Sequence, residues 1–217
     1  MASQEKKTGK SLKRRSSVST SDPPLKRFLA RVLNKQPEDN EPTSSGQNTV
    51  PDPNNLPSQR DLEPLDTIKV LHWFGRFICG RCPMIPSLSP MDPVRWIVNV
   101  DRALYLQGWQ AEPFLTPATV TFLYLVCREA ISSCLVSKQE LKAALMACLY
   151  VSYSYTGART SYPFGLFIAG SVKEAFWNRC LAVAITMSGE MLRIYNDPAY
   201  FAETFADLKA EGDWERS

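Results

Sequence analysis

The sequence lacks the residue clusters from which catalytic and metal sites are usually built. It holds one histidine, His72, and its six cysteines include only one closely spaced pair, Cys79 and Cys82. A structural zinc site needs four ligands, and no second pair has the spacing to complete one. No glycine-rich phosphate loop occurs. We therefore expect no metal and no other cofactor.

Paired carboxylates are missing as well. The acidic residues that fall within predicted helices are spread over different helices, with no spacing that pairs two of them: Asp101, Glu129, Glu140 and Glu174. A nucleophile formed by cysteine and His72 would also need a third group to orient the histidine, and no motif supplies one. The sequence thus predicts a protein that is not an enzyme.

Long apolar runs are also absent. The longest, residues 143–155, is shorter than the roughly 20 residues of a membrane-spanning helix. The sequence shows no secretory signal. Four of the six cysteines fall within apolar helical patterns, where a reduced thiol packs as a small apolar group. These features predict a reducing compartment, the cytoplasm.

Aromatic residues divide the chain into two parts. Residues 1–66 contain one of the 23 aromatic residues, Phe28, and eight of the sixteen prolines. A segment so poor in large apolar side chains cannot bury enough surface to offset the entropy of ordering it. The sequence therefore predicts a disordered tail over 1–66, followed by one domain over 67–217 with a core of ordinary size.

Charge divides the tail again. Residues 1–35 have a net charge of +8, residues 36–66 of −6, and the remainder of +1. The near-neutral domain is not expected to bind nucleic acid. Apolar and basic residues alternate at helical spacing over 25–35, which favours contact with an anionic membrane or a partner groove. The basic tail also allows a nuclear location. Ser16 and Ser17 follow a basic stretch typical of phosphorylation sites, although the stretch could equally be a solvated charge cluster.

Helix signals recur after the tail, without competing strand patterns. About six helices are predicted, five of them opening at a capping device: Asp92 before Pro93, Thr116 before Pro117, Ser137 with Glu140, Ser171 with Glu174, and Asp197 before Pro198. The helix after Ser137 is apolar nearly all round, so other helices must surround it. The expected fold is all-α, with this helix at the centre.

Six motifs carry a resemblance to a known family. The motifs, in chain order, are SPMDPVRWIVNVDRALYLQGWQ, FLTPATVTFLYLVCREAISS, CLYVSYSYTG, SYP, KEAFWNRCL and DPAYF with FADLK. Through them the chain resembles the cyclin-dependent kinase 5 activator family over about residues 70–210. The resemblance implies a cyclin-like box that forms a heterodimer with a kinase. The activator would set the kinase helix that bears the glutamate partner of the ATP-binding lysine, and would brace the activation loop without its phosphorylation. The alternative is a cyclin-box adaptor that binds a partner without activating a kinase.

The resemblance also assigns a partner-binding surface to three segments. The residues it implies are Thr156, Gly157, Arg159, Ser161, Tyr162, Pro163, Asn178, Ile194, Asp197 and Pro198. Four positions depart from the family pattern, which leads us to expect methionine at Thr156, an acid at Arg159, aspartate at Asn178 and asparagine at Ile185. These departures keep the adaptor alternative open. Family members that begin Met-Gly look N-myristoylated, whereas Ala2 follows Met1 here, so no myristoyl group is expected.

Overall fold

A computed structural model describes residues 67–159 and 161–213 of the chain. The predicted features at Ala2, Ser16, Ser17 and 25–35, and the tail over 1–66, lie outside these residues. The described part is helical throughout and contains no strand. Its elements are α2 (Thr67–Arg81), α3 (Met91–Leu106), α4 (Pro117–Ala130), α5 (Lys138–Thr156), the short 3₁₀ helix η1 (Phe164–Leu166), α6 (Lys173–Asn196) and α7 (Pro198–Asp213).

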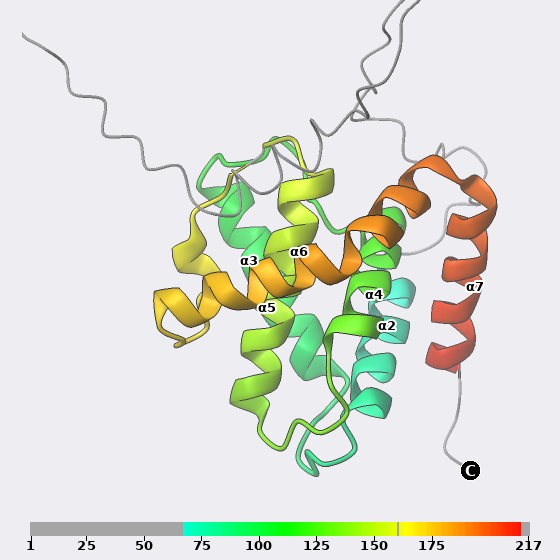
Figure 1. The fold of residues 1–217 in the computed structure, drawn as a ribbon, viewed down its shortest axis with the longest axis horizontal. Helices are drawn as coiled ribbons and strands as arrows, with labels where there is room; N and C mark the ends of the chain where they lie inside the picture. The colour runs from blue at the N-terminus through cyan, green and yellow to red at the C-terminus, as the bar shows by residue number, and fades with distance from the viewer. Residues whose placement is uncertain (1–66, 160, 214–217) are drawn as a thin grey trace, which may run out of the picture.

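The all-α prediction is confirmed, and two helices share the centre of the domain. Residues 145–154 of α5 are buried without a break, and α5 packs against α3, α4 and α6. Helix α4 is buried almost as completely and packs against α2, α5, α6 and α7. In Figure 1, α6 crosses both central helices, and α7 lies beside α2 at the edge of the domain. Because neither central helix has a polar face, each must be enclosed by its neighbours.

Three of the five predicted caps are present. Thr116 and Thr119 form a capping box at the start of α4, and the Ser137 hydroxyl accepts the Glu140 N–H at the start of α5. Asp197 Oδ1 accepts the backbone N–H groups of residues 199 and 200 and so caps α7. Each side chain satisfies a backbone donor that the first turn of a helix leaves without a partner.

Two predicted caps are wrong. Helix α3 begins at Met91, before Asp92, and the Asp92 carboxylate accepts the Lys138 ammonium at 2.8 Å and the Ser89 N–H at 3.0 Å. Helix α6 begins at Lys173 with no side-chain cap, and the Ser171 hydroxyl instead accepts a hydrogen bond from Arg179. In both places the side chain that the local sequence predicts as a cap bonds to another side chain, Lys138 or Arg179, instead.

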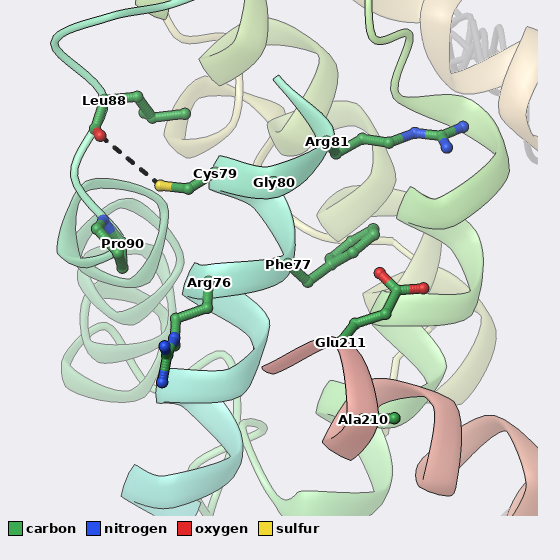
Figure 2. Close-up of a pocket in the computed structure, with 9 residues that line it drawn as sticks. All are labelled: Arg76, Phe77, Cys79, Gly80, Arg81, Leu88, Pro90, Ala210 and Glu211. Carbon is green, nitrogen blue, oxygen red and sulfur yellow. Dashed lines mark hydrogen bonds between the residues drawn. The ribbon is translucent and has the colours of Figure 1, made fainter. Parts of the chain in front are cut away.

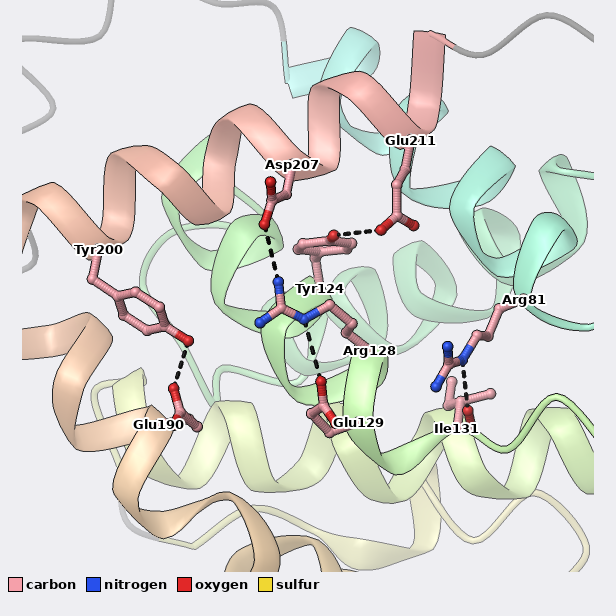
Figure 3. A network of polar contacts seen from close by, with 9 residues as sticks. All are labelled: Arg81, Tyr124, Arg128, Glu129, Ile131, Glu190, Tyr200, Asp207 and Glu211. Atoms are coloured by element: carbon pink, nitrogen blue, oxygen red, sulfur yellow. Dashed lines mark hydrogen bonds and ion pairs between the residues drawn. The ribbon is translucent and has the colours of Figure 1, made fainter.

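Helix α7 is held to the domain by polar contacts along its length (Figure 3). The Tyr124 hydroxyl donates to Glu211 at 2.9 Å, and the Arg128 guanidinium pairs with Asp207 at 3.1 Å. From α7 itself, the Tyr200 hydroxyl donates to Glu190 at 2.5 Å. At its far end, the Trp73 indole donates to Asp213. Burial and the bond to Glu211 raise the pKa of the Tyr124 hydroxyl, so it donates at every physiological pH.

Candidate functional site

Helix α2 borders a groove whose polar groups are engaged by the protein itself. This groove of about 800 Å³ lies between α2, the loop before α3 and the end of α7 (Figure 2). Its polar groups contact the protein itself: Cys79 donates to the Leu88 carbonyl, Arg81 to the Ile131 carbonyl, and Glu211 accepts from Tyr124. These contacts hold the helices together.

The described residues also contain no group of three His, Cys, Asp or Glu side chains that could hold a metal ion. Cys79 is partly buried, Cys82 is buried, and neither forms a disulfide. Across residues 67–159 and 161–213, no helix is long and apolar enough to cross a membrane.

A buried aspartate organises the C-terminal end of α5. Asp101 of α3 is 7% exposed, and its Oδ1 atom accepts three hydrogen bonds. The donors are the Tyr153 hydroxyl at 2.6 Å, the Gln110 side-chain amide at 2.6 Å and the Phe114 backbone N–H at 2.9 Å. The rings of Phe114 and Tyr153 also stack, with centroids 3.8 Å apart. A buried carboxylate needs such compensation, and here it fixes the last turn of α5 against α3.

The next layer of the site is Tyr162, which lies in the turn after α5. Its ring is 4% exposed and meets Tyr153 edge to face, with centroids 5.0 Å apart. Its hydroxyl accepts the backbone N–H of Arg159, which closes the turn upon itself. A Cβ atom at Gly157 would overlap this hydroxyl. Gly157 is therefore required by space and not by backbone conformation, since its φ is −82°.

The remaining residues of the turn divide into internal and outward-facing groups. The Thr156 hydroxyl donates to the Ser152 carbonyl at 2.9 Å, and Pro163, at φ −66°, leads into η1. Ser161 is exposed, and Arg159 is exposed with its guanidinium 5.6 Å from the centroid of the Trp109 ring. The outer surface of the turn therefore presents a hydroxyl and a cation above a rigid aromatic base.

The other two predicted segments lie at opposite halves of α6. Asn178, Ile185 and Leu192 are exposed at spacings of seven residues, so they line one face of the helix. Ile194 is 1% exposed and belongs to the core. Asp197 is half-buried as the cap of α7, whereas Pro198 is exposed.

Aromatic contacts bring the three segments around the C-terminal half of α5. Tyr155 meets Tyr195 with centroids 6.3 Å apart, which places the start of the turn beside the α6–α7 junction. Trp177, the neighbour of Asn178, contacts Tyr150 of α5 and Phe164 of η1, at 5.3 Å and 6.0 Å. Tyr162 and Ile194 shape this surface from within. Arg159, Ser161, Asn178 and Pro198 are its exposed members.

Sequence reasoning missed the groups beneath this surface. The sequence places Asp101 in an apolar row of its predicted helix and offers no second carboxylate as its partner. The partners are instead a tyrosine, an amide and a backbone N–H. A charged residue on the buried face of a helix was the available signal, because such a residue is rarely buried without partners. No signal marked Trp109 as the ring beneath Arg159.

Comparison with known proteins agrees with this arrangement of motifs. A family model described as cyclin-dependent kinase 5 activator protein matches residues 3–214. Cyclin-dependent kinase 5 activator 1 of Homo sapiens is 50% identical over 157 residues, which cover 72% of this chain and 51% of that protein. Cyclin-dependent kinase 5 activator 2 of Homo sapiens is 44% identical over 156 residues, which cover 71% of this chain and 42% of that protein.

A distant relative aligns over a stretch of nearly the same length. Cyclin-dependent kinase 5 activator 1 of Caenorhabditis elegans is 37% identical over 158 residues, which cover 71% of this chain and 43% of that protein. The chain thus spans about half the length of the curated relatives it matches. Because the family model matches almost all of its residues, the chain belongs to the cyclin-dependent kinase 5 activator family.

Proposed function

We propose that this chain is a non-catalytic regulatory subunit that binds a cyclin-dependent kinase of the kinase 5 type and activates it as a heterodimer. The observation that carries the proposal is the family match over residues 3–214. The named relatives are activators of that kinase. The turn at the end of α5 supports it, since Tyr162 orders this surface through its contacts with Tyr153 and the Arg159 N–H.

The proposed mechanism has two parts. One part of the surface, the exposed row of α6, docks on the kinase helix whose glutamate pairs with the ATP-binding lysine. The other part, the turn over 156–163, lies against the activation loop and holds it open. Kinases of this class need both the Lys–Glu pair and an ordered loop for activity. Direct bracing would replace the phosphate that normally orders the loop.

The stiffness of the turn is what makes bracing effective. Pro163 fixes its own φ and restricts the residue before it to extended backbone. The Tyr162 ring is packed against Tyr153, and Tyr153 is bonded to Asp101. A surface that is already ordered loses less entropy on contact than a flexible one. More of the free energy of contact is therefore available to order the kinase loop.

Two of the departures from the family pattern, Arg159 and Asn178, act at the proposed contact itself. Asn178 and Arg159 are exposed, so their side chains face the partner and contribute little to the core. A neutral amide at 178 makes a weaker hydrogen bond than a carboxylate would. A cation at 159 favours acidic groups on the partner. We infer that the kinase partner of this chain differs in charge at the matching positions.

The basic end of the chain is assigned a second task. Residues 1–35, with a net charge of +8, would hold the subunit at anionic membranes from the cytoplasmic side. Attachment by charge is reversible and weakens with salt. Binding to vesicles that contain phosphatidylserine should fall steeply between low and high salt. Binding that is unchanged at high salt would refute attachment by charge.

Reconstitution with purified proteins tests the proposed function. The full chain is titrated into unphosphorylated cyclin-dependent kinase 5, and the phosphorylation rate and the binding constant are measured separately. A saturable rise in rate supports activation, and a kinase with alanine at the phosphorylatable position of its activation loop should be activated equally. Binding without a rise in rate would favour the adaptor alternative. No binding would reject both.

A further inference from the structure

The outer face of α3 carries a row of exposed side chains. Met91, Arg95, Val98, Arg102 and Tyr105 recur every three or four residues and are all exposed. Helix α3 packs against α2 and α5 with its opposite side. The exposed fractions of 44% for Met91 and 48% for Tyr105 show that the row is not polar alone. It therefore combines two cations with apolar and aromatic surface.

A cleft runs beside this row. It has a volume of about 190 Å³, enough for a small apolar side chain, and lies between α3, α5 and the segment around η1. Val100 and Met146 are its buried members, and Asn99 lies on its α3 side. On the helix, Arg95 and Arg102 stand one turn before and one turn after Asn99. The α5 side supplies a third cation, Lys142, whose ammonium lies 5.8 Å from the centroid of the Trp96 ring.

None of these three cations forms a close ion pair within residues 67–159 and 161–213, although the charge of Arg95 helps to lower the pKa of Asp92. The nearest carboxylate of the helix, Asp92, is paired with Lys138, and Asp101 is buried in its own network. The face is thus an apolar cleft with an unbalanced positive rim, and it suits an acidic segment with small apolar anchors.

We propose that residues 36–66 of this same chain bind along the face formed by Arg95, Val98, Asn99, Arg102 and Lys142. This segment carries seven acids against Arg60, a net charge of −6, and it offers Val50, Leu56, Leu62 and Leu65 as anchors. It joins α2 directly at Thr67. Thirty-one residues can span up to about 100 Å, and α3 is about 24 Å long, so reach does not limit the contact.

Tethering makes this contact effective although each charge pair is weak. Pairs of exposed charges contribute little individually. A segment linked to its own binding face, however, has an effective concentration in the millimolar range, so a weak interaction is still populated. The contact should loosen as salt screens the charges. It would occupy the outer face of α3 and the rim of the cleft between α3 and α5, and it does not depend on the proposed kinase contact.

Zero-length cross-linking of the full chain tests this directly. A carbodiimide joins a lysine ammonium to a carboxylate that touches it, and Lys142 is the only lysine of the face. Mass spectrometry should find Lys142 joined to acids within 36–66, more often than Lys173 or Lys209, and the difference should shrink at high salt. Equal linkage of all three lysines, or a pattern independent of salt, would overturn the proposal.

Charge-matched variants sharpen the test. Arg102→Glu should lower the yield of Lys142 links about three- to fivefold, the scale of one weak exposed pair with its sign reversed. Lys209→Glu makes the same change of charge on α7 and should leave that yield unaltered. Equal loss in both variants would indicate only a general charge effect and reject the site. Mixing chains labelled with ¹⁵N with unlabelled chains identifies links between copies, and links that are mainly of this kind would assign the face to a second copy instead.

Discussion

The Tyr153 hydroxyl donates a hydrogen bond of 2.6 Å to Asp101, across 52 positions of the chain. This contact joins the last turn of α5 to the middle of α3. Burial first, and then the bond to the carboxylate, raise the pKa of the tyrosine, so the hydroxyl keeps its proton and stays a donor. Tyr162 packs on the same ring, and the turn after α5 is therefore anchored through Tyr153 to a buried charge.

Removing the Tyr153 hydroxyl should weaken the whole domain. Tyr153→Phe leaves Asp101 with two donors, and a hydrogen bond to a charged group contributes about 1.5–3 kcal/mol. We expect a loss of that size in the free energy of unfolding from denaturant titration. Tyr105→Phe, on the exposed face of α3, should change stability by less than about 0.5 kcal/mol. Equal stability of both variants and wild type would show that the buried bond is not stabilising.

Leu145 tests whether α5 lies within a closed core. Its side chain is fully buried, and Leu145→Ala should lower the free energy of unfolding by about 2–5 kcal/mol through lost burial and an unfilled cavity. Chemical denaturation measures the change. A loss under about 1 kcal/mol would mean that α5 is at the surface or that its neighbours collapse into the space.

The ion pair between Asp92 and Lys138 predicts a dependence on pH. The hydrogen bond from Lys138, followed by that from the Ser89 N–H, lowers the pKa of Asp92 in the folded state. A carboxylate whose pKa is lower in the folded state than in the unfolded state stabilises the fold at pH values above its unfolded pKa, about 3.9. This stabilisation is lost as the pH falls through the folded pKa. Asp92→Asn should therefore cost about 1 kcal/mol or less at pH 7, because the pair is partly exposed. At about pH 2 the cost should vanish. An equal difference at both pH values would contradict the assignment.

The cysteines should differ sharply in reactivity. Cys134 is exposed, whereas Cys127 and Cys180 are buried, and burial is the main cause that raises the pKa of both buried thiols. The thiolate is the reactive form, so a brief treatment with iodoacetamide should modify Cys134 and spare the buried pair. Peptide mass spectrometry reads the sites. Equal modification of Cys127 in the native protein would place α4 outside the core.

The helices were predictable because each has a local signal. The apolar circumference of the helix after Ser137 predicted its burial, and proline after Thr116 or Asp197 marked two helix starts that the structure confirms. Asp92 and Ser171 were misjudged because their partners, Lys138 and Arg179, are distant in sequence or on a later turn. Capping propensity is local, and a tertiary partner can override it.

The candidate site was predictable only through the family motifs. Those motifs identified the turn and the α6 positions, but they could not show that Tyr162 and Ile194 are buried while Asn178 and Pro198 are exposed. Nor could they reveal the link from Asp101 through Tyr153 to Tyr162. Such a link depends on how α3 and α5 pack, which spacing along the chain does not encode.

The turn itself can be altered while its surface residues stay in place. Tyr162→Ala with Pro163→Gly should lower the maximum rate of the activated kinase more than it lowers affinity, because the turn loses both its aromatic anchor and its stiffness. The expected loss of coupling is about 1–3 kcal/mol. Measuring rate and affinity at matched stability separates this from unfolding. A double variant that binds and activates like wild type would show that this segment is only a connecting turn without a role in activation.

Substitutions at two glycines test whether the packed turn drives kinase activation. A Cβ atom at Gly157 would overlap the Tyr162 hydroxyl, whereas one at Gly165 in η1 would meet nothing within 4 Å. Both substitutions add one methyl group. The maximum rate of unphosphorylated cyclin-dependent kinase 5 is measured at saturating Gly157→Ala, Gly165→Ala and wild-type chain. We expect a rate about tenfold lower for Gly157→Ala and an unchanged rate for Gly165→Ala, and equal rates for all three would show that the packed turn does not drive activation.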